Sequence, residues 1–178
     1  MKTLKQHINE ALKIGKNLSE WSAYSCQPKT RDELKKIIKD RISKEGSNCD
    51  LNDIDTTLIT DMSYLFDYSL FNGDISNWNV SNVIYMTCMF QESKFNGDIS
   101  KWDVSKVKKM NFMFCKSPFN GDISNWNVSE VENMRWMFRN SEFNKDISKW
   151  NIKSNCDTSN MFKDCNIKEE YKPKSLQK

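Results

Sequence analysis

Apolar residues recur along this chain every 24 positions, and the register holds from residue 62 to residue 150. Each block opens on a Phe, has a Trp seven residues later, and continues with a Val, two Met and another Phe. The clearest recurring positions are Phe71, Phe95, Phe119 and Phe143; Trp78, Trp102, Trp126 and Trp150; and Met62, Met86, Met110 and Met134. A fixed period of this length is typical of a repeat array, in which each unit buries its apolar face against its neighbours.

The block of residues 71–94 predicts the elements of one unit. Its first four residues, FNGD, predict a turn, because Asn72 and Gly73 accept left-handed backbone angles and Asp74 can accept hydrogen bonds from nearby amides. The next six residues, 75–80, predict a short strand. Ser81 is then placed to cap a short helix over residues 83–90, whose apolar positions fall on one face.

Parallel stacking of such units places equivalent side chains about 5 Å apart. The Trp, Phe, Ile, Val and Met columns are then expected to form one continuous core, and not a cofactor site. A ladder of side-chain amides is expected for the column Asn72, Asn96, Asn120 and Asn144. The parallel Asp column fits the turn, and calcium binding along it is an alternative; that column is Asp74, Asp98, Asp122 and Asp146.

Both ends of the array depart from the pattern, as the ends of a stack of repeats must. Residues 50–66 match the second part of a block with Ile54 in the Trp column, and Thr158 replaces the Met at the other end. Before the array, a capping box at Thr30–Glu33 predicts a helix that ends at Gly46 and covers the first edge of the stack. Residues 3–18 predict an earlier amphipathic helix, with a membrane-surface role as an alternative.

The pattern therefore predicts an α/β solenoid of about four to five 24-residue turns over residues 50–164. Residues 1–49 are expected to form a helical N-terminal cap, and residues 165–178 a C-terminal tail. A length of 178 residues leaves little room for a second domain.

Charge and hydropathy narrow the classes of partner. Residues 1–49 carry 11 basic and 6 acidic side chains, whereas residues 50–164 carry 12 and 16. A weakly acidic body argues against nucleic acid, which needs clustered Lys and Arg on one face. No apolar run is long enough to span a membrane, and the first residues lack the apolar stretch of a signal peptide. We therefore expect a cytoplasmic or virion-associated protein.

The chain shows no arrangement typical of a catalytic or metal site. Its six cysteines have no CxxC spacing, and His7 is its single histidine. Because zinc sites need closely spaced ligand pairs, we expect reduced thiols, no metal and no cofactor. A phosphate-binding loop, a GxSxG motif and a Cys/His pair are all missing, so we expect no enzymatic activity.

The candidate binding residues are those that vary while the scaffold repeats. One column holds Tyr64, Cys88, Phe112 and Trp136, which differ in identity although three are aromatic. Such variation suggests partial exposure, and exposed aromatics are typical of protein-binding hot spots; burial under a neighbouring turn is the alternative. With the adjacent variable columns, the predicted partner-binding residues are Tyr64, Tyr85, Phe112, Trp136, Lys108, Lys109, Glu132 and Arg135.

A second candidate surface is the polar face of the predicted strands. It repeats a serine column, made of Ser76, Ser100, Ser124 and Ser148, between columns of Asn, Lys and Asp. Such a face could bind an extended ligand such as a glycan, or it could simply be a solvated face.

The blocks FNGDISNWNVSNVIYMTCMF and FNGDISKWDVSKVKKMNFMF resemble the BspA-like leucine-rich repeat family, also described as mycoplasma-type surface-protein repeats. The resemblance covers residues 50 to about 164, and the preceding DELKKIIKDRISKEG is similar to the lead-in of such proteins. It implies a leucine-rich-repeat-like solenoid that binds other proteins. Several members are bacterial surface proteins implicated in adhesion, and some are encoded by phages.

We therefore expect a non-enzymatic module for protein–protein recognition. The alternatives are a structural or accessory component of a phage particle or another assembly, in which the chain self-associates, and a surface adhesin. Fold-level resemblance does not name the partner.

Overall fold

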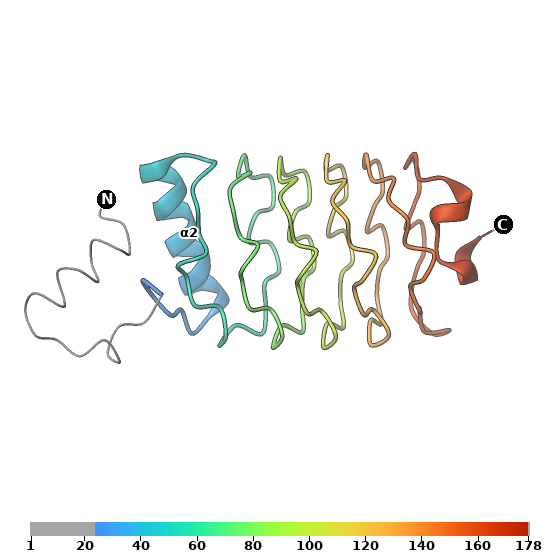
Figure 1. Ribbon diagram of the computed structural model, residues 1–178, viewed down its shortest axis with the longest axis horizontal. Coiled ribbons are helices and arrows are strands. Elements are labelled where there is room, and N and C mark those ends of the chain that lie inside the picture. Colours follow the sequence, from blue (N-terminus) through green and yellow to red (C-terminus); the bar gives the residue numbers. More distant parts are fainter. Residues whose placement is uncertain (1–23, 178) are drawn as a thin grey trace, which may run out of the picture.

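The computed structural model describes residues 24–177, which form a row of stacked coils (Figure 1). Three short helices accompany the coils in this part of the chain: α2 (Arg31–Glu45), η2 (Glu169–Tyr171) and η3 (Lys174–Leu176). Helix α2 lies at the N-terminal end of the row, and η2 and η3 lie at the opposite end (Figure 1). The helix predicted over residues 3–18, and the membrane role considered for it, fall outside the described residues.

Successive coils are joined by a line of parallel backbone bridges at a spacing of 24 residues. The bridged positions are Asp61, Tyr85, Lys109, Asn133 and Asp157. Each amide that follows a bridge donates to the next coil, as Met86 N does to Lys109 O at 2.9 Å and Met110 N to Asn133 O at 2.9 Å. The 24-residue period of the sequence is therefore the length of one coil.

The elements predicted within each coil are wrong. Residues 75–80 form no strand, because Trp78 N donates back to Ile75 O and closes a turn. Residues 83–90 form no helix either: alternate amides donate to the next coil, Cys88 N to Asn111 O at 3.0 Å and Phe90 N to Met113 O at 2.9 Å. An α-helix needs those amides for carbonyls four residues earlier in the chain. Ser81 accordingly caps no helix, and its amide donates to the Asn79 side chain.

The predicted core columns are buried and stack along the axis of the array. One ladder runs through Phe66, Phe90, Phe114, Phe138 and Phe162, with neighbouring ring centroids 5.4–5.7 Å apart. A second ladder runs through Phe71, Phe95, Phe119 and Phe143. The Trp indoles lie beside them, and each Nε1–H donates to a carbonyl of the preceding coil, as Trp126 does to Ile99 at 3.2 Å. The core prediction is confirmed.

The asparagine column does form a ladder between coils, but each of its hydrogen bonds joins a side chain to the backbone and not, as predicted, one side-chain amide to another. The side-chain oxygen of each Asn accepts from the amide of the Asn one coil later, at 2.8 Å for Asn72 to Asn96 and for Asn96 to Asn120. The ladder continues through Asn144, which accepts from the amide of Lys168. Each coil thereby supplies an acceptor for an amide that its own turn leaves without a partner.

The aspartate column closes turns within each coil. Each carboxylate accepts from the amide of the Ser two residues later, at 2.9 Å for both Asp98 and Asp122. Hydrogen bonds from the amide and hydroxyl of that Ser hold the pKa of each carboxyl below its usual value, at Asp74, Asp98, Asp122 and Asp146. Among residues 24–177, no group of His, Cys, Asp and Glu side chains is arranged to hold a metal ion.

Acid should therefore destabilise this protein through its aspartate turns. A carboxyl whose pKa is lowered on folding adds stability above its unfolded pKa, near 3.9, and that stability is lost as the pH falls through the folded value. We expect the melting temperature, followed by circular dichroism, to fall as the pH drops below about 4. An Asp98→Asn/Asp122→Asn variant keeps the acceptor oxygens without the titration, so its acid-induced decline should be shallower. An equally steep decline would contradict the assignment.

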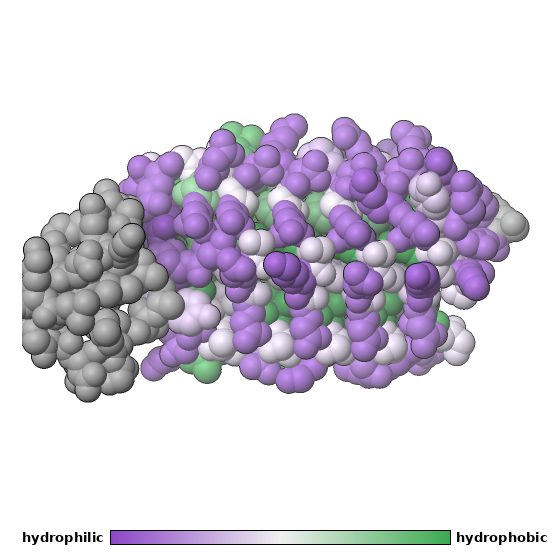
Figure 2. All heavy atoms as spheres, viewed as in Figure 1, coloured by the Kyte–Doolittle hydropathy of each residue, from purple (hydrophilic) through white to green (hydrophobic). Residues whose placement is uncertain are grey.

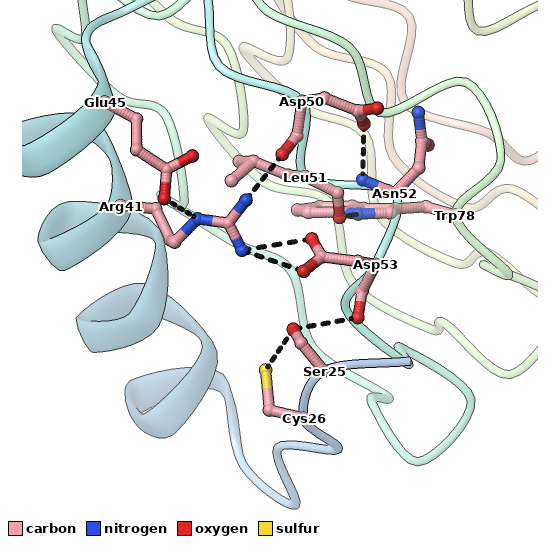
Figure 3. Close-up of polar contacts among 9 residues, drawn as sticks. All are labelled: Ser25, Cys26, Arg41, Glu45, Asp50, Leu51, Asn52, Asp53 and Trp78. Carbon is pink, nitrogen blue, oxygen red and sulfur yellow. Dashed lines mark hydrogen bonds and ion pairs between the residues drawn. The ribbon is translucent and has the colours of Figure 1, made fainter. Parts of the chain in front are cut away.

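Helix α2 closes the N-terminal end of the core as the capping box predicts. Thr30 Oγ1 accepts from Glu33 N at 3.2 Å, and the helix ends at Glu45 with Gly46 as its C-cap, where φ is 92°. Leu34 and Ile38 are fully buried in the same core as the coils. Arg41 fixes the helix to the first coil, with Nη1 on the Asp53 carboxylate at 3.0 Å and Nη2 on Asp50 O at 2.9 Å (Figure 3).

The C-terminal end of the core is covered by residues that follow the last coil. Ile167 is buried, and Ile147 N donates to Tyr171 O at 2.9 Å. Tyr171 and Leu176, from η2 and η3, pack partly buried against the core. Both ends of the stack are thus protected from open-edge pairing.

Candidate functional site

The column of varying aromatic residues lies on one line across the coils. Tyr64 is 42% exposed, Phe112 and Trp136 are half-buried, and Cys88 is buried. The predicted partial exposure therefore holds for the three aromatic residues and not for the cysteine.

Every member of this column has left-handed backbone angles. The φ values are 63° at Tyr64, 54° at Cys88, 61° at Phe112 and 61° at Trp136. Their amides donate to the next coil, as Phe112 N does to Arg135 O at 3.0 Å, so the inter-coil ladder imposes the conformation. Left-handed angles are unfavourable for bulky side chains and easier for Asn. Asn160 occupies the equivalent position one coil after Trp136, with a φ of 55°.

Phe112 and Trp136 form the centre of a compact side-chain cluster. Their rings meet edge to face, with centroids 4.9 Å apart. The guanidinium carbon of Arg135 lies 5.1 Å from the centre of the Trp136 ring, and that of Arg139 lies 4.5 Å from it. Both distances are typical of cation–π contacts. We call these four residues, Phe112, Arg135, Trp136 and Arg139, the Trp136 cluster.

Arg139 is the member that sequence reasoning missed. It belongs to a column with Asp67, Gln91 and Cys115 that shows no common residue type. Its position three residues after Trp136 could have indicated the contact, because a turn brings residues at this spacing onto the same side of the coil. The predicted helix over this segment was wrong, but the same spacing in a turn still joins the two side chains.

The polar atoms of the cluster are incompletely partnered. Trp136 Nε1 and Arg139 Nε are buried donors with no acceptor among residues 24–177. Neither Arg135 nor Arg139 has a carboxylate of the described residues within ion-pair distance, although nine other such contacts occur there. Buried donors without acceptors are costly and uncommon in folded proteins.

The other predicted residues lie in separate groups. Lys109 sits over the Tyr85 ring, 5.7 Å from its centre. Lys108 pairs with Glu130 at 2.7 Å and lies 3.6 Å from Glu132. The hydrogen bond to Glu130 raises the pKa of Lys108. The structure therefore brings together Phe112, Trp136 and Arg135, and it leaves the remaining predicted residues outside the cluster.

Tyr64 lies at the N-terminal end of the column, beside Cys88 and helix α2. Lys35 Nζ of α2 donates to Tyr64 O at 2.6 Å. Burial raises the pKa of the Cys88 thiol to about 11. Because the thiolate is the reactive form, Cys88 is an inert packing group at neutral pH.

The polar serine surface is partly accessible, because Ser76, Ser100, Ser124 and Ser148 are all half-buried. A depression on it is lined by Asp122, Ser124, Asn125, Lys145, Asp146 and Lys149. Figure 2 shows rows of hydrophilic side chains crossing the coils, with apolar side chains visible between them. None of the helices in residues 24–177 has the length and apolar composition needed to cross a membrane.

Comparison with known families identifies the family to which the chain belongs. A family model described as "Mycoplasma protein of unknown function, DUF285" matches residues 33–118 and 115–172. The chain belongs to the DUF285 family. The DUF285 match begins within α2 and includes every coil and the whole Trp136 cluster. This confirms a mycoplasma-type repeat family, and neither the curated proteins nor the solved structures gave a match.

Proposed function

We propose that this protein is a non-enzymatic recognition module that binds another protein through the Trp136 cluster. In this proposal the stacked coils are an α/β, leucine-rich-repeat-like solenoid of the BspA-like type, and they act as a rigid support without a cofactor. The DUF285 match supports a repeat protein and carries no specific activity.

The observation that carries the proposal is the presence of large aromatic side chains on left-handed backbone. Phe112 and Trp136 both have φ values of 61°. At the equivalent position of the last coil, Asn160 adopts a φ of 55° with a small polar side chain. Non-glycine residues in this region cost about 1–3 kcal/mol when they are bulky, and such strain clusters at functional sites. Because Asn160 adopts the same backbone conformation without a ring, the coil conformation does not by itself explain the aromatic residues, and binding is the role that we propose for them.

The make-up of the cluster fits a binding hot spot. Aromatic and arginine side chains dominate such spots because they bury a large area and supply directed hydrogen bonds. Phe112 and Trp136 hold each other edge to face, and two guanidiniums pack on the indole. The side chains are therefore ordered before a partner arrives, which lowers the entropy cost of association.

Exchanging both rings for asparagine should abolish partner binding while preserving the fold. The variant Phe112→Asn/Trp136→Asn suits the left-handed backbone, because Asn160 already occupies this column. We expect a protein captured from a lysate of the producing cell by the wild type, identified by mass spectrometry, to be lost with this variant. The melting temperature should stay within a few degrees, because relief of left-handed strain, about 1–3 kcal/mol for a bulky residue, offsets the lost contacts of the half-buried rings.

The matched control removes an exposed tyrosine from a neighbouring column. Tyr68 is 63% exposed with a φ of 54°, and Asn140 holds the equivalent position, so Tyr68→Asn makes the same kind of exchange. It should retain the partner. Equal capture by wild type and double variant would reject the site, and self-association alone would favour a component of a phage particle or another assembly. A partner exposed on a host surface would favour an adhesin.

A further inference from the structure

The two arginines of the Trp136 cluster form no ion pair with any carboxylate of residues 24–177. Hydrogen bonds from the hydroxyl and the amide of Ser159 lower the pKa of Asp157, and the charge of Arg135 lowers it further. Asp157 Oδ1 accepts from Ser159 N at 2.9 Å and lies beyond ion-pair distance of Arg135. Burial raises the pKa of the Cys115 thiol, and the positive charge of Arg139 partly opposes this rise.

Other basic side chains near this cluster do have acidic partners. Lys116 pairs with Glu92 at 2.9 Å, and Lys108 and Lys153 both pair with Glu130. Of the four arginines among residues 24–177, Arg31 and Arg41 contact carboxylates, whereas Arg135 and Arg139 form no ion pair with a described residue. Both guanidiniums pack on the Trp136 indole, with their carbons 5.1 and 4.5 Å from the ring centre.

We propose that the Trp136 cluster recognises an acidic segment of a protein partner. A carboxylate of the partner binds the guanidiniums of Arg135 and Arg139, and an adjacent apolar side chain packs on Phe112 and Trp136. This inference rests on the protein-recognition function proposed above and assigns the chemistry of the partner at that site.

Guanidinium geometry and the charge of the chain both favour a carboxylate. Arginine presents a planar fork that matches two carboxylate oxygens, and charge-assisted bonds of this type are about twice as strong as neutral ones. A long polyanion such as nucleic acid would also meet the body of the array, where 16 acidic side chains outnumber 12 basic ones over residues 50–164. A short acidic segment meets only the local positive charge.

The test uses short fluorescent peptides in which a pair of Glu residues is flanked by Leu or Trp. Matched peptides carry Gln or Lys in place of Glu, and binding is measured by fluorescence anisotropy with the full chain. We expect the Glu peptides to bind the wild type, and the Gln peptides to bind at least about tenfold more weakly. The variant Arg135→Gln/Arg139→Gln should lose affinity for Glu peptides by a similar factor. Added salt should weaken the binding of the Glu peptides more than the binding of the Gln peptides.

A charge-matched control separates local recognition from net charge. The variant Lys101→Gln/Lys149→Gln also removes two positive charges, from exposed positions in the turns after Asp98 and Asp146, and it should bind Glu peptides as the wild type does. Equal binding of Glu and Gln peptides, equal losses in the two variants, or no binding of any Glu peptide would overturn the inference. So would tighter binding of an oligonucleotide of similar length.

The same measurements distinguish a failure of the acidic-partner inference from a failure of the proposed recognition function. Peptides that bind regardless of charge, but not to Phe112→Asn/Trp136→Asn, would keep the recognition site and reject the acidic partner. Loss of a captured protein with that variant, together with no response to Glu peptides, would have the same meaning. Failure of both measurements would reject the site itself.

Discussion

Replacing Phe114 with alanine should lower the free energy of unfolding by about 3–5 kcal/mol, the range found for large aromatic truncations in cores. The ring is fully buried at the middle of the longer Phe ladder. It stacks on Phe119 with centroids 4.2 Å apart, and on Phe90 and Phe138 at 5.6 and 5.7 Å. Its removal leaves a cavity between coils that cannot collapse without shifting both neighbours. Urea denaturation followed by circular dichroism measures the loss.

The matched control for this change lies at the end of the same ladder. Phe162 is only partly buried, and among residues 24–177 its ring stacks on Phe138 and on no other ring, with centroids 5.7 Å apart. Phe162→Ala should therefore cost clearly less than Phe114→Ala. In an array where each coil contacts only its neighbours, a defect in a central coil also weakens the coupling between the two halves. The urea unfolding transition of Phe114→Ala should therefore be broader than that of the wild type. Equal losses at the two positions would contradict a continuous stacked core.

Alanine at Gly73 should also strongly destabilise the protein, although the substitution adds one carbon. The new Cβ would lie 2.0 Å from the backbone oxygen of Cys49 and 2.7 Å from a ring carbon of Phe71. The first of these atoms belongs to the segment that follows α2 and cannot move alone. Overpacking of this kind typically costs about 1–3 kcal/mol or more. A lower urea midpoint with an unchanged slope would report the loss.

Gly121 provides the comparison, because it holds the same place two coils later. A Cβ there would meet only the Phe119 ring at 2.8 and 2.9 Å, with the nearest backbone oxygen 3.6 Å away. Lys145 occupies this position in the following coil, where Phe143 remains stacked. Gly121→Ala should therefore be the milder change. If both glycines tolerated alanine equally, the packing of α2 against the first coil would be looser than described.

The sequence predicted the arrangement of the array better than the conformation of its units. The Phe, Trp and Met columns, the Asn ladder and the helix that ends at Gly46 all follow from spacing and residue type. Gly46 has a positive φ, whereas Gly73 and its equivalents do not, in agreement with Lys145 at the same position. The strand over residues 75–80 and the helix over residues 83–90 were wrong. Apolar residues at intervals of three and four fit a helix and also a succession of tight turns.

The candidate site was predicted in part for a related reason. Phe112, Trp136 and Arg135 were recognised because they vary within a constant frame. Lys108 and Glu132 vary in the same way, but the structure places them in a surface ion-pair group with Glu130. Exposed ion pairs of this kind add little to the stability of a protein. Variation marks the surface, and it does not tell which surface residues meet.

By itself, the sequence determined the period, the core and the ends, because each depends on which residue types recur and where the recurrence stops. Only the tertiary structure decided what each coil looks like and which side chains cluster. The reason is that the amides of Cys88, Phe112 and Trp136 find their acceptors one coil further along the chain. These long-range bonds impose left-handed angles that local preference disfavours, and the resulting turns place Arg139 beside Trp136.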